Sequence, residues 1–360
     1  MKRSLLDVTD LSVEEINDLT DTALDIIENP DKYAHACDRK KLATLVFEPS
    51  TRTRLSFEAA MYELGGHVIS VPSGGGSSAT KGESVHDTAE MVSCYADIIA
   101  MRHPKDGAAR VLAQSASVPV INAGDGGHCH PTQTLADLLT IRREMGRFDH
   151  LTIGLCGDLK YGRTVHSLIN AMSRYKGTKF ILISPRELKV PGYVYRHLEE
   201  LGIPYQETTD LEGAMPGLDV LYMTRIQRER FEDPEEYERL KDSYILTPDK
   251  LRSAKADMIV MHPLPRVNEI SVAVDDDPRA AYFRQALNGK YMRMALILKL
   301  LGEAGKDADK SLPAGALVDR LVCPNARCIT TTEQELPQVF LPEPGGKSCR
   351  CLYCETQVTL

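Results

Sequence analysis

Five consecutive polar residues with the chemistry of a phosphate site follow a short apolar stretch. The segment Ser50–Arg54 reads S-T-R-T-R and stands between the apolar residues 42–47 and a helical pattern. A helix N-terminus offers unpaired N–H groups and the positive end of the helix dipole. Hydroxyl groups add donors, and arginine adds a planar fork that suits phosphate oxygens. One S-T-R sequence alone is more often a solvated helix cap, but five donors after a predicted parallel strand favour a phosphate site.

A second group of chemically active residues is a cysteine cluster near the end of the chain. The protein has nine cysteines, and five of them fall in the last 40 residues. Cys323 and Cys328 form a C-x4-C pair, and Cys351 and Cys354 form a C-x2-C pair. Four thiolates at this spacing are typical of a tetrahedral structural zinc site, although Cys349 is a rival ligand. A redox or incidental role is the alternative. The surrounding tail is short and rich in proline, so we expect the metal to fold it.

The elements that must position these groups alternate between strands and helices. Nearly continuous apolar runs predict buried strands, and helical patterns lie between most of them. We expect strands at 42–47, 67–71, 98–102, 118–124, 151–158, 179–185, 219–225 and 257–265. This pattern predicts an α/β fold with two doubly wound parallel-sheet domains and a small C-terminal zinc-binding β module.

The same pass along the chain suggests where the domains begin and end. A helix at 131–146 joins the two halves, and a last helix at about 282–303 is apolar enough to return to the first domain. We therefore expect a first domain at 1–132, completed by 283–303, and a second at 133–282. A linker at 304–320 and a zinc-binding domain at 321–360 would follow.

Composition excludes several classes of partner. The chain of 360 residues has a formal net charge of −8, which argues against nucleic acid or an anionic membrane as the main partner. No stretch approaches the roughly 18–20 apolar residues of a membrane helix. The first residues turn acidic too early for a signal peptide, so we expect a cytoplasmic protein.

Several segments together resemble the aspartate and ornithine carbamoyltransferases. The resemblance covers about residues 5–303 and is carried by Glu48–Arg54, His130–Gln133, Gly157–Ser167, Met223–Gln227 and His262–Arg266. The last three look like the aspartate enzymes in particular, because the ornithine enzymes would carry H-C-L-P where this chain has H-P-L-P. The resemblance implies carbamoyl transfer to L-aspartate, an early step of de novo pyrimidine biosynthesis. Transfer to another amine such as ornithine, and a non-catalytic scaffold subunit, are the alternatives.

The resemblance also implies which residues hold carbamoyl phosphate. Arg102 would reach both the phosphate and the carbonyl oxygen, and His130 would polarise that carbonyl. Gln133 and the backbone carbonyls of Leu264 and Pro265 would meet the carbamoyl NH2 group. The implied binding set is Ser50, Thr51, Arg52, Thr53, Arg102, His130, Gln133, Leu264 and Pro265.

A further set of residues would bind the two carboxylates of L-aspartate. The resemblance assigns L-aspartate to Lys81, Arg163, Arg225 and Gln227. Lys81 and Ser77 match loop residues that reach into the neighbouring subunit's active site, which implies a homotrimer with shared sites or a dimer of such trimers. The implied catalytic residues are Arg52, Thr53, Lys81, Arg102 and His130. No covalent intermediate and no catalytic cofactor are expected, since positioning and charge stabilisation suffice.

The cysteine-rich tail is similar to the zinc domain of the separate aspartate carbamoyltransferase regulatory chain. The linker at 304–320 is too short for a nucleotide-binding domain of ordinary size. We therefore expect one structural zinc and no CTP or ATP effector site in this chain. The module would brace contacts within or between catalytic trimers.

Overall fold

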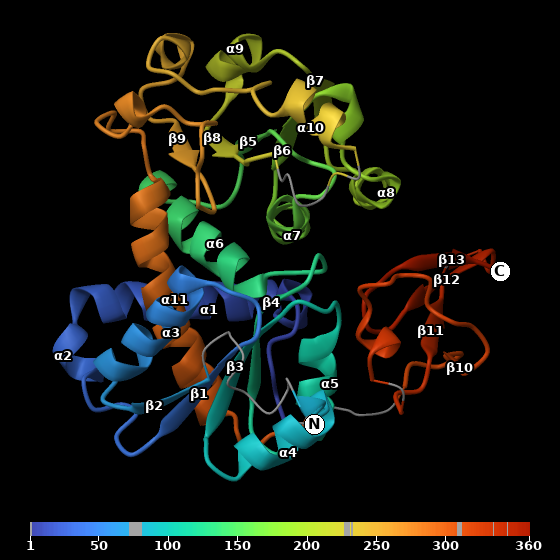
Figure 1. Cartoon of the computed structure of the whole chain (residues 1–360). Coiled ribbons are helices and arrows are strands. Elements are labelled where there is room, and N and C mark those ends of the chain that lie inside the picture. The colour runs from blue at the N-terminus through green and yellow to red at the C-terminus, as the bar shows by residue number, and fades with distance from the viewer. Residues whose placement is uncertain are drawn as a thin grey trace. The chain divides into compact units, whose positions relative to one another are not determined.

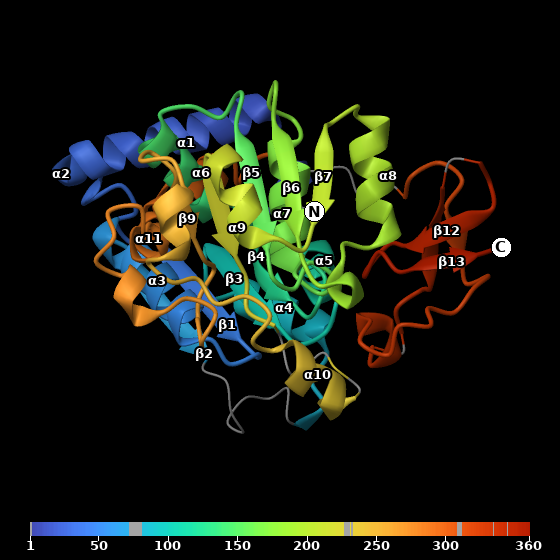
Figure 2. The ribbon, with the colours of Figure 1, turned by 90° about the horizontal axis from the view of Figure 1, so that it is seen from above.

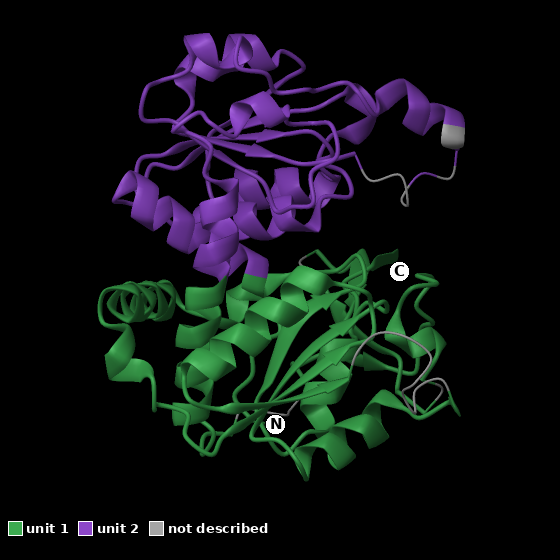
Figure 3. Ribbon diagram, turned by 60° about the vertical axis from the view of Figure 1, so that its left-hand side comes forward, with its two compact units in different colours: residues 1–132, 290–360 green, residues 133–289 purple. Residues whose placement is uncertain are grey.

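The chain folds into two compact units, which Figure 3 shows in different colours. The computed structural model describes residues 2–71, 81–226, 231, 233–307, 312–333, 335–343 and 345–360. The first unit contains residues 1–132 and 290–360, and the second contains residues 133–289. Each unit is built on one parallel sheet, and a small antiparallel sheet forms near the C-terminus. The predicted fold class is confirmed. No helix in the described part of the chain is long and apolar enough to span a membrane.

The first unit has a four-stranded parallel sheet in the order β2-β1-β3-β4. Its strands are β1 (Lys41–Val46), β2 (His67–Val71), β3 (Ile98–His103) and β4 (Val120–Asp125). Its helices are α1 (Val13–Glu28), α2 (Pro30–Tyr33), α3 (Thr51–Glu63), α4 (Val85–Ser93) and α5 (Ala108–Ser115). The central strands are apolar along nearly their whole length because helices cover both faces of the sheet.

A helix from the far end of the sequence completes the first unit. Helix α11 (Tyr282–Gly302) enters this unit at Lys290, whose Nζ pairs with Oε1 of Glu63 at 2.6 Å. The guanidinium of Arg293 lies 5.0 Å from the ring centre of Phe57. Leu296 and Ile297 are fully buried. The first unit is therefore closed by residues that come more than 150 positions after its last strand.

The second unit has a five-stranded parallel sheet in the order β7-β6-β5-β8-β9. Figure 2 shows β5, β6 and β7 side by side. The strands are β5 (Thr152–Cys156), β6 (Lys179–Ile183), β7 (Tyr205–Thr208), β8 (Val220–Met223) and β9 (Ile259–Met261). The helices are α6 (Pro131–Met145), α7 (Arg163–Met172), α8 (Gly192–Glu200), α9 (Leu211–Ala214) and α10 (Pro234–Leu240). The edge strand β7 is polar and was not predicted from the sequence.

The C-terminal module is a small antiparallel sheet in the order β10-β11-β12-β13 (Figure 1). Its strands are β10 (Leu317–Val318), β11 (Val339–Pro342), β12 (Ser348–Cys351) and β13 (Gln357–Thr359). Strand β10 lies within the stretch that the sequence suggested as linker. The predicted zinc-type β module is therefore present, and it clusters with the first unit.

One aspartate joins the module to the first unit. The backbone N–H of Asp106 donates to the carbonyl of Arg327, and the N–H of Ile329 donates to the carbonyl of Asp106, both at 2.9 Å. The Asp106 carboxylate also accepts from the side chain of Asn325 at 2.9 Å. The same carboxylate accepts the N–H of Gly127 at 2.6 Å. The module thus holds the loop that follows β3 and, through it, the loop that follows β4.

Candidate active site and metal centre

The first half of the candidate site is the start of helix α3. Strand β1 ends at Val46, and the chain enters the helix through Pro49 with Ser50 as the N-cap residue. The Ser50 hydroxyl donates to the Thr53 hydroxyl at 2.9 Å and does not accept from a helix N–H group. The N–H groups of the first turn are therefore not capped by this side chain. They lie at the start of the helix, where the sequence analysis expects an anion site.

Arg102 stands at the carboxyl end of β3, beside the same segment. It is paired in register with Val46, the last residue of β1. Its NH2 lies 3.2 Å from Oε2 of Glu48, and its NH1 lies 3.5 Å from Nε2 of His130. Burial lowers the pKa of Arg102, while the carboxylate of Glu48 opposes this shift. Among the described residues, its Nε atom is buried without a hydrogen-bond partner, so it can donate to a bound anion.

His130 is brought next to Arg102 by a glycine in the neighbouring strand. His130 is 8% exposed and directly precedes helix α6. Gly124, at the end of β4, has a φ of +117°. A Cβ atom there would lie 2.9 Å from NH1 of Arg102 and 3.3 Å from Cδ2 of His130. Only glycine leaves room for both side chains in this conformation.

The second unit places two of the predicted aspartate residues, together with a turn assigned to carbamoyl phosphate, at the carboxyl ends of its strands. Arg163 begins helix α7 after β5, Arg225 follows β8, and the Leu264–Pro265 turn follows β9. These strands are parallel neighbours, so their carboxyl ends lie together. The backbone N–H of Asp158 donates to the Thr224 hydroxyl at 3.0 Å, which ties the loops after β5 and β8 to each other.

The remaining predicted residues fall in different places. Gln133 lies on α6 in the second unit, where its amide nitrogen donates to Asp137 at 2.8 Å. Lys81 is exposed in the first unit. Gln227 and Ser77 lie outside the described residues. The residues assigned to carbamoyl phosphate thus divide between the two units, and their roles stay predictions.

Sequence reasoning gave no role to several residues that shape these groups. Glu48 was within a recognised segment, but its pairing with Arg102 depends on the adjacency of β1 and β3. Gly124 carried no signal beyond its residue type. Asp137 stands four positions after Gln133 on a predicted helix, and that spacing could have indicated the pair.

The four predicted zinc ligands lie together in the C-terminal module. The sulfur atoms of Cys323, Cys328, Cys351 and Cys354 all lie within 4.8 Å of one another. The Cys323–Cys354 and Cys328–Cys351 sulfur distances are 3.5 and 3.9 Å. Tetrahedral zinc with bonds of about 2.3 Å requires sulfur atoms about 3.8 Å apart, so the cluster fits the ion. A hydrogen bond from Cys323 lowers the pKa of the Cys328 thiol.

Cys349, the alternative zinc ligand, makes a different contact. The Cys349 sulfur donates to the Val358 carbonyl at 3.7 Å, across the β12–β13 pair. A further group, Asp125, His128 and Cys129, also brings its donor atoms within 4.8 Å. Its carboxylate already accepts from Gly107 at 2.8 Å and from His128 at 3.1 Å, so hydrogen bonding accounts for this cluster.

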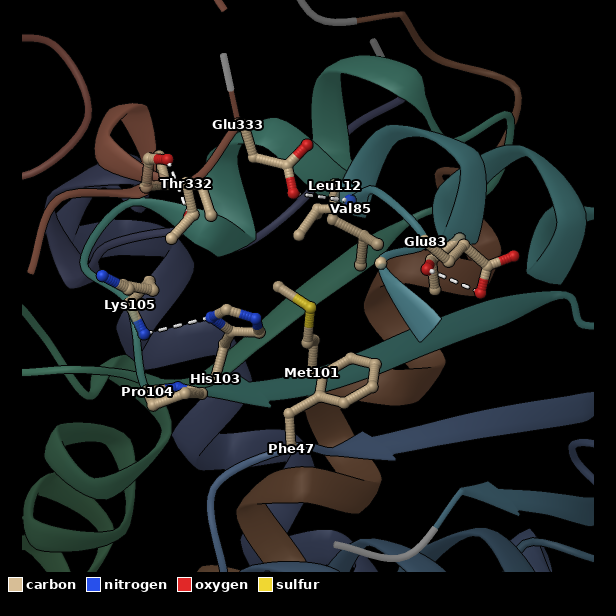
Figure 4. A pocket seen from close by; sticks show the side chains of 13 residues that line it. Phe47, Glu83, Val85, Met101, His103, Pro104, Lys105, Leu112, Thr332 and Glu333 are labelled. Atoms are coloured by element: carbon tan, nitrogen blue, oxygen red, sulfur yellow. Dashed lines mark hydrogen bonds between the residues drawn. The ribbon is translucent and has the colours of Figure 1, made fainter. Parts of the chain in front are cut away.

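A cavity of about 340 Å³ lies between the first sheet and the zinc module (Figure 4). Phe47, Met101 and His103 line it from the ends of β1 and β3, and Ile329 and Glu333 line it from the module. The Glu333 carboxylate accepts the Val85 N–H at 3.0 Å. None of the described residues assigned to either substrate lines this cavity, so it is separate from the candidate site.

Comparison with known proteins places the chain in a family. Residues 3–143 match the carbamoyl-P binding domain of the aspartate/ornithine carbamoyltransferases, and residues 149–300 match their Asp/Orn binding domain. Residues 316–360 match the metal binding domain of the aspartate carbamoyltransferase regulatory chain. The chain belongs to the aspartate/ornithine carbamoyltransferase family.

Within that family, the chain is similar to aspartate carbamoyltransferases. The chain is 61% identical to the aspartate carbamoyltransferase catalytic subunit of Clostridium novyi over 300 residues, which cover 83% of this chain and 98% of the relative. The corresponding subunit of Lachnoclostridium phytofermentans is 60% identical with the same coverage. The catalytic subunit of M. jannaschii aspartate transcarbamoylase is 46% identical with a TM-score of 0.79, covering 85% and 100% of the two chains. The predicted resemblance to a catalytic chain fused to a regulatory-type zinc domain is confirmed.

Proposed function

We propose that this chain transfers the carbamoyl group of carbamoyl phosphate to the amine of L-aspartate. The products are N-carbamoyl-L-aspartate and phosphate, and the reaction is an early step of de novo pyrimidine biosynthesis. The observation that carries this proposal is the placement of Arg102 and His130 side by side at the end of the first sheet, next to the start of α3. A T. cruzi aspartate transcarbamoylase that is 38% identical, with a TM-score of 0.78 and coverage of 83% and 97%, has been solved with carbamoyl phosphate and aspartate.

The first unit supplies the electrophile. The N–H groups and hydroxyls of Ser50–Thr53 bind the phosphate, together with the guanidinium of Arg52. Arg102 and His130 donate to the carbonyl oxygen and stabilise the negative charge that develops there. One such donor contributes about 3 kcal/mol to transition-state stabilisation in comparable sites. The buried Nε of Arg102 supplies a further donor to the anion.

The second unit supplies the nucleophile. Arg163, Arg225 and Gln227 hold the two carboxylates of aspartate, so that its neutral amine faces the carbonyl carbon. A carbon–nitrogen bond forms and a tetrahedral intermediate results. The carbon–oxygen bond to phosphate then breaks, and the leaving phosphate takes up the amine proton. No group on the enzyme needs to become covalently attached.

We further propose a homotrimer, or a dimer of trimers, in which Lys81 completes the site of a neighbouring subunit. The exposure of Lys81 supports this assignment. Chains carrying Lys81→Ala and chains carrying Arg52→Ala should each be inactive alone. Mixed trimers should regain part of the activity, because some sites combine two unaltered halves. A mixture as inactive as its components would contradict the shared site.

The C-terminal module holds one structural zinc in this proposal. Cys323, Cys328, Cys351 and Cys354 are the ligands, and the bound ion ties the C-x4-C and C-x2-C segments together. Because the module clusters with the first unit, we propose that it braces the catalytic chain. The expected cytoplasmic location and the expected absence of a nucleotide effector site stay predictions.

The test of the reaction is a parallel assay with two amines. Purified protein and carbamoyl phosphate are incubated with L-aspartate or with L-ornithine, and both products are measured. Carbamoyl aspartate without citrulline supports the proposal. Citrulline alone would leave the phosphate site standing and overturn the assignment of Arg163 and Arg225. No product from either amine would favour the scaffold alternative.

A further inference from the structure

The turn after β9 depends on one buried histidine. The backbone N–H of Leu264 donates to Nδ1 of His262 at 2.8 Å. Leu264 has a φ of +53°, a left-handed conformation that a bulky residue adopts only where its surroundings hold it there. The His262 ring is 1% exposed and so has little freedom to move. The course of the Leu264–Pro265 backbone is therefore set by this ring.

Glu269 in turn fixes which ring nitrogen of His262 carries the hydrogen. Because Nδ1 accepts a backbone N–H, it carries no hydrogen, and the ring hydrogen is on Nε2. Nε2 lies 2.7 Å from Oε1 of Glu269. The other carboxylate oxygen accepts the N–H groups of Val267 and Asn268 at 3.0 and 3.1 Å. Burial acts to raise the pKa of Glu269, but these hydrogen bonds outweigh it and lower the pKa below its usual value.

The same histidine is connected to Gln133. The backbone N–H of His262 donates to the side-chain oxygen of Gln285 at 2.9 Å. The side-chain amide nitrogen of Gln285 donates to Oδ1 of Asp137 at 2.6 Å. That Oδ1 also accepts from the amide nitrogen of Gln133 at 2.8 Å. A carboxylate can only accept, so the Gln133 nitrogen faces Asp137 and its oxygen remains as an acceptor for a ligand.

This network leaves the second unit with a set of hydrogen-bond acceptors. No described residue donates to the carbonyl oxygens of Leu264 and Pro265. Together with the side-chain oxygen of Gln133 they suit an NH2 group. They disfavour a methyl group of the same size, because acceptors covered by the bound ligand would then stay unpaired.

We propose that Glu269, acting through His262, is a positioning residue by which the second unit selects a carbamoyl group over an acetyl group. The inference rests on the proposed function, because it takes carbamoyl phosphate as the substrate that these acceptors meet. It adds a determinant outside the residues that touch the substrate. Glu269 is 4% exposed and acts only on the shape and orientation of the acceptors.

The decisive variant is Glu269→Gln. If the amide oxygen faces His262, the amide NH2 group faces the N–H groups of Val267 and Asn268. If the amide turns over, its NH2 group faces the ring Nε2–H group of His262. Donor meets donor in either case, so the turn must shift. Glu269→Asp keeps the charge. It is expected to change the preference for a carbamoyl over an acetyl group in the same direction but by less. It serves as the second variant if Glu269→Gln does not fold.

Asp219→Asn is the matched control. Asp219 is a buried carboxylate of the same unit that accepts from the Thr152 N–H at 2.8 Å and from Lys255 at 2.7 Å. It precedes strand β8, away from the carboxyl edge of the sheet that carries the turn. Its replacement should lower stability without changing which acyl group is preferred.

The measurement is calorimetric binding of two stable analogues that differ in one group. Phosphonoacetamide carries the NH2 group and phosphonoacetone carries a methyl group in its place. The wild-type protein and Asp219→Asn should prefer the amide by about tenfold or more, and Glu269→Gln should bring the ratio close to one. An unchanged ratio in both Glu269 variants, or an equal loss in Asp219→Asn, would overturn the inference. Failure of the proposed function looks different: the wild-type protein would prefer the amide yet form no carbamoyl aspartate.

Discussion

The NH1 atom of Arg102 lies 3.5 Å from Nε2 of His130, although 28 residues separate them in the chain. In the proposed mechanism both side chains donate to one developing charge, so their contributions should not be independent. Arg102→Ala and His130→Ala should each lower kcat/KM by about 100-fold or more. The loss of kcat/KM in the double variant should be smaller than the product of the two single losses. Steady-state rates of the wild-type protein, the two single variants and the double variant give the coupling free energy between the side chains. Full multiplicativity would show that the two contributions are independent and would contradict this prediction.

Gly124→Ala should disturb the same pair without removing either member. The added Cβ atom would lie 2.9 Å from NH1 of Arg102, so the guanidinium must move and the KM for carbamoyl phosphate should rise. The control is Gly146→Ala, because Gly146 also has a positive φ of +71° but nothing within 4 Å of a new Cβ. Both variants should lose roughly 1 kcal/mol of stability from the backbone alone. An equal KM in both variants would contradict the steric argument.

Zinc should be lost from one cysteine variant and retained in another. Cys328→Ser removes a member of the four-sulfur cluster, whereas Cys349→Ser changes a buried thiol that faces Val358. Metal analysis should find about one zinc per chain in Cys349→Ser and less in Cys328→Ser. The midpoint of thermal unfolding should fall by about 5 °C or more in Cys328→Ser, because the module shares a core with the first unit. Retained zinc in Cys328→Ser would exclude it as a ligand.

Stability should fall in mild acid because of a partly buried histidine. His166 donates from Nε2 to the Leu159 carbonyl at 2.7 Å and accepts from the Tyr193 hydroxyl at 2.8 Å. Burial lowers the pKa of His166 to about 4. The unfolded chain, with a pKa of about 6.5 at this residue, binds one proton more between these values. The free energy of unfolding therefore falls by up to about 1.4 kcal/mol per pH unit as the pH drops from about 6.5 to 4.

His166→Gln should flatten that part of the stability curve, as measured by urea unfolding at pH 7 and pH 5. The comparison variant is His35→Gln, because the His35 side chain is 84% exposed. This variant should keep the slope of the wild-type protein. A slope that is the same in all three proteins would assign the acid sensitivity to other groups.

The fold could be predicted largely from apolar runs, and its exceptions have a physical cause. Strands β1, β3 and β4 are largely buried on both faces, so each contains a run of apolar residues. Strand β7 has no buried residue and carries polar side chains because it closes the edge of the second sheet. Such a strand is stabilised by pairing with β6 and leaves little trace in its own composition.

The candidate site could be predicted where a segment carries its chemistry locally. Ser50–Arg54 and the four cysteines were recognisable because their types and spacing suffice. Glu48, Gly124 and Glu269 were not assigned, since each acts on a side chain that only the folded chain brings near. The structure therefore adds mainly residues that position other side chains, rather than residues that bind the substrates.

The return of α11 to the first unit has a consequence for protein synthesis. That unit is discontinuous, and residues 133–289 emerge from the ribosome before the helix that completes it. At roughly 5–20 residues per second, the wait lasts on the order of ten to thirty seconds. During this interval the first unit lacks the buried side chains Leu296 and Ile297 of α11, while the contiguous second unit can already fold. The N-terminal part of the chain is thus the segment that chaperones would need to protect until translation is nearly complete.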